Sequence, residues 1–128
     1  GIDTANYIYS GEAVNIDLGA NYFAGAAFGD VLINIENVTG TYYDDFLTGD
    51  VNDNVLDGGS GDDYLDGGNG NDTLIGGAGQ NTMLGGRGDD TFMNLLGGNY
   101  MDGGDGADTV SYVNVSDFVN VDLGVGYT

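Results

Sequence analysis

The chain of 128 residues contains 26 glycines, 21 acidic residues and a single basic residue, Arg87, so its formal charge at pH 7 is −20. This charge argues against nucleic acid and anionic membrane surfaces as partners, because both would repel the chain, and it favours cations. The sequence has no Cys or His, which excludes thiolate and imidazole metal sites and a His-dependent catalytic triad. No apolar run approaches the ~18 residues of a membrane-spanning helix, so we expect no membrane insertion.

Residues 1–39 are predicted to form flanking strands that lead into a repeat. Val14, Ile16 and Leu18 alternate with polar residues, a pattern that indicates a half-buried strand. Residues 24–28 should form a loop or a short turn rather than an amphipathic helix, because the stretch is short and flanked by glycine. A second apolar segment could continue the repeat, through Leu32, Ile33, Ile35 and Val38.

A nine-residue repeat occupies residues 40–111. It divides this stretch without a gap into eight nonapeptides that begin at residues 40, 49, 58, 67, 76, 85, 94 and 103. Position eight is always apolar: Leu47, Leu56, Leu65, Leu74, Met83, Phe92, Met101 and Val110. Position six is always Asp or Asn: Asp45, Asn54, Asp63, Asp72, Asn81, Asp90, Asn99 and Asp108. Glu36 should lie near this position-six column.

Each part of the nonapeptide suits a metal-binding loop followed by a strand. Glycine at positions one, two and four permits the positive φ angles of a tight loop. Aspartate supplies the hard anionic oxygen that Ca²⁺ prefers. The apolar step at positions seven to nine fits a three-residue strand with one side chain pointing inward.

The pattern G-G-x-G-x-D-x-U-x resembles the RTX (repeats-in-toxin, hemolysin-type) calcium-binding proteins over residues 40–111. The resemblance implies an all-β fold, a parallel β-roll in which two nonapeptides make one turn. Carboxylates stacked ~4.7 Å apart would repel one another unless a divalent cation lay between them. We therefore expect the repeat to be disordered without Ca²⁺ and to fold on binding it.

The resemblance also implies which residues hold about four or five calcium ions. An ion lies between one loop, which gives the carbonyls of positions two and four and the side chain of position six, and the loop two nonapeptides later. The later loop gives the carbonyls of positions one and three and the side chain of position six.

One side of the roll should bind more tightly. Its best candidate site combines Gly68, Gly70 and Asp72 with Gly85, Arg87 and Asp90. The next combines Gly86, Gly88 and Asp90 with Gly103, Asp105 and Asp108. A weaker one combines Asp50, Asn52 and Asn54 with Gly67, Asn69 and Asp72.

The opposite side offers two further candidate sites. The first combines Thr41, Tyr43 and Asp45 with Gly58, Ser60 and Asp63. The second combines Gly59, Gly61 and Asp63 with Gly76, Ala78 and Asn81. A last pair of loops, through Asn81 and Asn99, offers no carboxylate; we expect it to be weak or empty, with Leu95 and Leu96 capping or packing there.

The end of the chain repeats its beginning. Residues 106–128 align without gaps to residues 1–23, with ten identical positions, so residues 112–128 should start a further flanking unit that resembles residues 7–23. This predicts that the chain is a fragment of a longer protein. Its repeat blocks either recur about every 105 residues, or they are each flanked by segments of this kind without a strict tandem order. End strands of such a fragment would stack on neighbouring copies.

The expected function is a non-catalytic, calcium-dependent folding module of an extracellular or cell-surface protein of a Gram-negative bacterium, for which the resemblance implies type I secretion. One alternative is a module attached to a secreted protease, lipase or alginate epimerase, although the chain contains no HExxH or GxSxG motif. Another is an adhesin segment that binds ice or polysaccharide through threonines that recur in every second nonapeptide, Thr73, Thr91 and Thr109.

Overall fold

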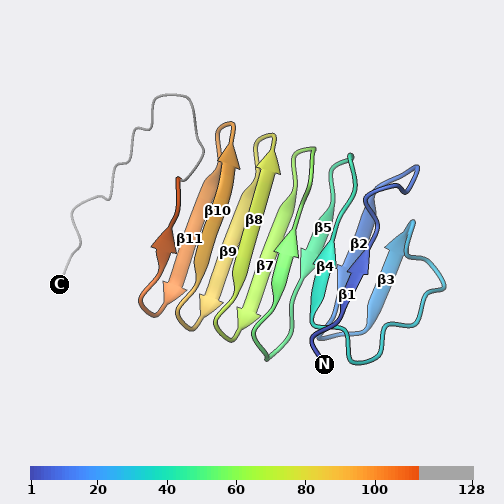
Figure 1. Cartoon of the computed structure of the whole chain (residues 1–128), viewed down its shortest axis with the longest axis horizontal. Coiled ribbons are helices and arrows are strands. Elements are labelled where there is room, and N and C mark those ends of the chain that lie inside the picture. Colours follow the sequence, from blue (N-terminus) through green and yellow to red (C-terminus); the bar gives the residue numbers. More distant parts are fainter. Residues whose placement is uncertain (113–128) are drawn as a thin grey trace.

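The computed structural model describes residues 1–112. Apart from Tyr112, the flanking unit predicted at residues 112–128 lies outside them. The regular elements of the described residues are strands, which lie side by side along the length of the molecule in Figure 1. No helix in this part of the chain has the length and apolar character needed to cross a membrane.

The strands form two six-stranded sheets. The first sheet has the order β1 (Thr4–Asn6), β4 (Asn37–Thr39), β6 (Val55–Asp57), β8 (Thr73–Ala78), β10 (Thr91–Leu96) and β12 (Thr109–Val110). The second has the order β11 (Tyr100–Asp105), β9 (Thr82–Arg87), β7 (Tyr64–Asn69), β5 (Phe46–Thr48), β2 (Val14–Asp17) and β3 (Tyr22–Gly25).

Within the repeat, each strand pairs in parallel with the strand two nonapeptides later. Thr73 of β8 pairs with Thr91 of β10, and Tyr64 of β7 pairs with Thr82 of β9. Alternate nonapeptides therefore supply alternate sheets, and two of them complete one turn. The all-β parallel roll of about four turns is confirmed.

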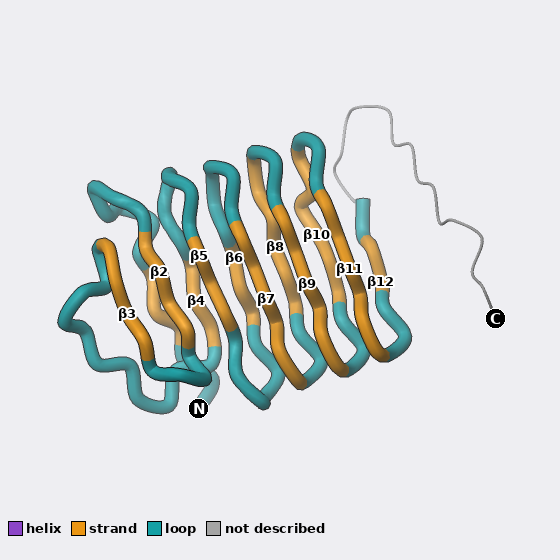
Figure 2. Tube along the Cα trace, turned by 180° about the vertical axis from the view of Figure 1, so that it is seen from behind, coloured by secondary structure: helices purple, strands orange, loops and turns teal. Residues whose placement is uncertain are grey.

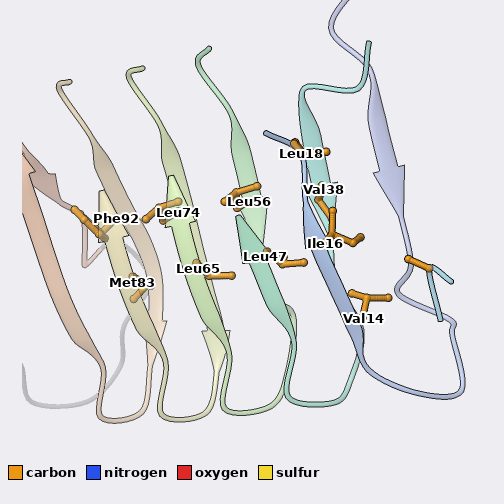
Figure 3. Close-up of a cluster of buried hydrophobic side chains, with 11 residues drawn as sticks. Val14, Ile16, Leu18, Val38, Leu47, Leu56, Leu65, Leu74, Met83 and Phe92 are labelled. Carbon is orange, nitrogen blue, oxygen red and sulfur yellow. The ribbon is translucent and has the colours of Figure 1, made fainter. Parts of the chain in front are cut away.

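The core is a single file of apolar side chains between the sheets (Figure 3). Strands β5 and β6 span the three residues predicted, whereas β7 to β11 span six and include positions one to three of the next nonapeptide. Successive side chains of a strand point to opposite faces, so positions eight and one face inward, and position one is glycine in β7, β8, β9 and β11. The buried members of this file within the repeat are Leu47, Leu56, Leu65, Leu74, Met83 and Phe92. Val110, in the last nonapeptide, is 40% exposed.

The flanking residues extend both sheets at one end. The predicted strand at residues 14–18 is confirmed as β2, which pairs in parallel with β5 and antiparallel with β3. Strand β1 pairs in parallel with β4, outside the periodicity of the repeat. In the second apolar segment only Asn37–Thr39 forms a strand; Val38 is buried, whereas Ile33 is 71% exposed and does not continue the core.

Candidate metal centre

The position-six side chains form a buried column beside each loop. All six of them from Asp45 to Asp90 are at most 3% exposed. The backbone N–H of each donates to Oδ1 of the position-six side chain two nonapeptides later; Asp72 N, for example, lies 2.8 Å from Asp90 Oδ1. From Asp63 onward, one side-chain oxygen of each member is thus used to join successive turns.

The second carboxylate oxygen has no such partner in three members of the column. Oδ2 is buried without a hydrogen-bond partner among the described residues in Asp63, Asp72 and Asp90. We call these the unpaired oxygens. A buried anionic oxygen without a partner costs several kcal/mol or is neutralised by a proton, and a bound cation would remove that cost.

Two kinds of ligand oxygen converge beside the glycine at position one. A β-carbon on Gly67 would contact Asp72 Oδ2 and lie 2.7 Å from Gly85 O. A β-carbon on Gly85 would contact Asp90 Oδ2 and lie 2.6 Å from Gly103 O. A position-six carboxylate and the position-one carbonyl of the loop two nonapeptides later therefore share one small space, in the pairing that the RTX resemblance implies.

The other predicted carbonyls face the same interval between loops. The carbonyls of Gly68 and Gly70 point at the space that a β-carbon would take on Gly86 and Gly88 in the later loop. Across the same interval, Gly70 N donates to Arg87 O at 2.9 Å, and Gly88 N donates to Asp105 O at the same distance. A carbonyl that accepts one hydrogen bond keeps a second lone pair for an ion.

Carbonyls are needed to complete a site. Within residues 1–112 no three acidic side chains lie close enough together to hold one ion. Two carboxylates combined with several carbonyl oxygens are a donor set of the kind that Ca²⁺ takes, with roughly 6–8 oxygen ligands in flexible geometry. The residues present therefore fit calcium.

Comparison with known families agrees with this geometry. The model of the RTX calcium-binding nonapeptide repeat matches residues 39–74, 57–92, 66–101 and 95–112. The chain belongs to the RTX calcium-binding repeat family. The matches span more than half of the chain and include the three unpaired oxygens. A comparison with curated proteins gave no match.

The first RTX loop differs from those that follow. Asp45 Oδ1 accepts hydrogen bonds from Val14 N at 2.8 Å and Thr41 Oγ1 at 3.0 Å, and Asp45 Oδ2 accepts one from Thr41 N. Both carboxylate oxygens are thus satisfied by the protein. The predicted site of Thr41, Tyr43 and Asp45 keeps one unpaired oxygen, on Asp63.

Asparagine replaces the RTX carboxylate at position six in Asn54 and Asn81, and the two amides are oriented differently. Asn81 Oδ1 accepts the N–H of Asp63, so its amide nitrogen faces the other way and donates to Gly76 O at 2.9 Å. Gly76 O is one of the predicted ligands. Asn54 has the opposite orientation: its amide nitrogen donates to Glu36 O in the preceding turn at 2.7 Å, and its Oδ1 accepts the N–H of Asp50 at 2.8 Å beside position one. The Asn81 amide therefore weakens its predicted site, whereas Asn54 offers a neutral oxygen in place of a carboxylate.

The two sides of the RTX roll, whose loops form two rows in Figure 2, are unequal. The side with Asp72 and Asp90 carries two unpaired oxygens, whereas the other carries one, on Asp63. Asp108 is exposed, although its Oδ1 accepts the N–H of Asp90 at 3.0 Å. In the last pair of loops on the weaker side, Leu96 is 42% exposed.

Position five forms a second ladder that the sequence argument did not assign. In each case Oδ1 of an Asp or Asn at position five accepts the backbone N–H of position five in the loop two nonapeptides later, at 2.8–2.9 Å. The acceptors are Asp44, Asp53, Asp62, Asn71 and Asp89. Asp or Asn occupies position five in five of eight nonapeptides, which was the available signal. This ladder explains the acidic pairs Asp62–Asp63 and Asp89–Asp90.

The position-six column also extends one turn before the RTX repeats. Glu36 precedes β4, and its Oε2 accepts the N–H of Asp3 at 2.9 Å. The same kind of bond joins successive turns inside the repeats, so Glu36 lies in the column, as expected.

Protons should compete with calcium for the unpaired oxygens. Burial, reinforced by neighbouring carboxylates and opposed by the N–H donated to Oδ1, raises the pKa of Asp63 to about 7 and that of Asp72 to about 6, from 3.8. The calcium-free folded state then binds more protons than the unfolded state between about pH 4 and 7, so its stability falls as pH rises through that window.

We therefore expect the calcium-free chain to show more β-structure at about pH 5 than at about pH 8, by far-ultraviolet circular dichroism. Isothermal titration calorimetry should show weaker apparent calcium binding at the lower pH. β-structure that decreases on acidification, or calcium affinity independent of pH, would contradict proton competition at these carboxylates.

Proposed function

We propose that residues 40–111 are a calcium-dependent folding module of a secreted or cell-surface bacterial protein, with a structural rather than a catalytic role. The observation that carries this proposal is the set of unpaired oxygens on Asp63, Asp72 and Asp90. These buried anions favour the unfolded chain unless a cation binds between the loops.

The apolar core is too small to offset the free-energy cost of these buried, unpaired anions. Six of the eight nonapeptides each bury one apolar side chain at position eight, whereas folding must order the backbone of every residue in the repeat. Interstrand hydrogen bonds offset part of that entropy cost, and calcium supplies a further favourable contribution that exists only in the folded state.

This balance suits a protein that folds after export. Low free calcium inside the cell would leave the repeats unfolded, and higher calcium outside would fold them. RTX repeats are typical of secreted or extracellular bacterial proteins, which supports this role. Of the expected four or five ions, the one between Asp72 and Asp90 should bind most tightly, because both carboxylates of that site carry an unpaired oxygen.

Removal of calcium tests the proposal. In millimolar calcium the chain should give a β-sheet circular dichroism spectrum and a compact radius by small-angle scattering. An excess of EGTA at about pH 8 should convert it to an expanded, unfolded chain, and added calcium should restore it, with a cooperative transition. Magnesium at equal concentration serves as the control for ionic strength. A β spectrum that is unchanged in EGTA would refute calcium-dependent folding.

A recognition role is a second candidate, supported by one observation. Thr73, Thr91 and Thr109 are aligned in register on β8, β10 and β12, as a ladder that binds ice or polysaccharide would require, with Thr109 exposed and the other two half-buried. Only these three threonines form the ladder, because the residue paired with Thr73 on the next strand, β6, is Val55. Threonine is also an ordinary strand residue, so the folding role remains the principal proposal.

A further inference from the structure

The outer face of the second sheet carries an aligned column of position-seven side chains. In strand order they are Asn15, Phe46, Tyr64, Thr82 and Tyr100. The rings of Phe46 and Tyr64 stack, with centroids 4.2 Å apart and planes at 8°. The small Thr82 interrupts the column before Tyr100, which is 61% exposed. Two strand spacings therefore separate Tyr64 from Tyr100, ~9.6 Å.

Carboxylates lie beside this interruption. Asp66 and Asp102 follow the two tyrosines by two residues on the same strands, and Leu84 stands between them in register. Residues two apart on a strand share one face. Burial and then repulsion by Asp66 raise the pKa of Tyr64.

We propose that the gap over Thr82, between Tyr64 and Tyr100, receives the Lys or Arg side chain of a basic polypeptide partner. A cation midway between the rings would lie ~4.8 Å from each, inside the ~6 Å range of cation–π attraction. Asp66 and Asp102 would balance its charge, and the net charge of −20 would steer a basic partner toward the roll.

The chain itself does not supply the cation. Its single basic residue, Arg87, pairs with Asp105 at 3.7 Å, and both side chains are exposed. The cation must therefore come from outside these 128 residues. The inference depends on the proposed function, because the column exists only when calcium holds β7, β9 and β11 in register.

A labelled oligo-arginine peptide, measured by fluorescence anisotropy in saturating calcium, tests the gap. Tyr100→Leu should weaken binding about three- to ten-fold by removing one ring. Thr82→Tyr should weaken it similarly by filling the gap, and it suits the fold because tyrosine occupies the same position on β7 and β11. Tyr9→Leu is the matched control, since Tyr9 is 91% exposed in the flank. None of these substitutions changes the net charge.

The wild type and all three variants should keep the same calcium-dependent circular dichroism transition. Peptide binding that is absent, or equal in the wild type and every variant, would overturn the cation gap and leave only general electrostatic attraction. Loss of the calcium transition in the wild type would instead refute the proposed folding role.

Discussion

Replacing Asp90 by asparagine is expected to raise the calcium concentration needed for folding by roughly 10- to 100-fold. Asp90 supplies its carboxylate to two of the predicted sites, one with Asp72 and one with Asp108. Its Oδ2 is unpaired, and an amide can offer a cation only one neutral oxygen. Loss of one charge-assisted contact costs about 1.5–3 kcal/mol, which corresponds to that change in affinity.

Asp89→Asn is the matched control for charge. Asp89 is adjacent, and its role is to accept the N–H of Ala107 at 2.9 Å. Asn71 already plays this role in the same ladder, where it accepts the N–H of Asp89, so asparagine is tolerated at this position. Calcium titrations followed by circular dichroism and calorimetry should show a change below about three-fold, or ~0.6 kcal/mol. Equal shifts for Asp89→Asn and Asp90→Asn would show that net charge, rather than this ligand, governs folding.

Gly85→Ala is expected to destabilise the calcium-loaded roll by about 1–3 kcal/mol, the usual cost of overpacking, and to weaken the site between Asp90 and Gly103. The φ angle of Gly85 is not positive, so alanine brings no backbone strain. Its β-carbon would instead occupy the space where Asp90 Oδ2 and Gly103 O converge. Urea unfolding in saturating calcium measures the stability, and calorimetry measures the affinity.

Gly98→Ala provides the comparison. Gly98 also lacks a positive φ, and nothing lies within 4 Å of the position of its β-carbon. The stability of this variant should change by less than about 0.5 kcal/mol, as for surface substitutions elsewhere. If Gly85→Ala were equally harmless and kept its calcium affinity, the ion could not lie beside position one.

The loops differ in how much they depend on calcium to fold. Asp45 is satisfied by Thr41 and Val14, and the flank adds buried core residues of its own, among them Ile16 and Val38. The later turns instead carry the unpaired oxygens. The flank therefore has the least need of calcium, and the turns around Asp72 and Asp90 have the greatest.

The sequence by itself determined the roll. Each nonapeptide carries its own turn glycines, one inward residue at position eight and one ligand at position six, and it contacts mainly the units next to it in a one-dimensional stack. The period therefore predicted the column from Leu47 to Phe92 without knowledge of long-range contacts. The register of two nonapeptides and the pairing of Asp72 with Gly85 came from the resemblance to the RTX repeats that this period carries.

Only the tertiary structure decided which ligands are unpaired. Asp45 and Asp63 are the same residue type at the same position of the repeat, yet Asp45 meets Val14, which belongs to the flank and reaches it through β2. The orientation of the Asn81 amide depends on an N–H from the preceding turn. The pairing of β1 with β4 and the exposure of Ile33 also follow from the path of the non-repetitive flank. Local periodicity carries no information about such contacts, because they depend on where distant segments meet.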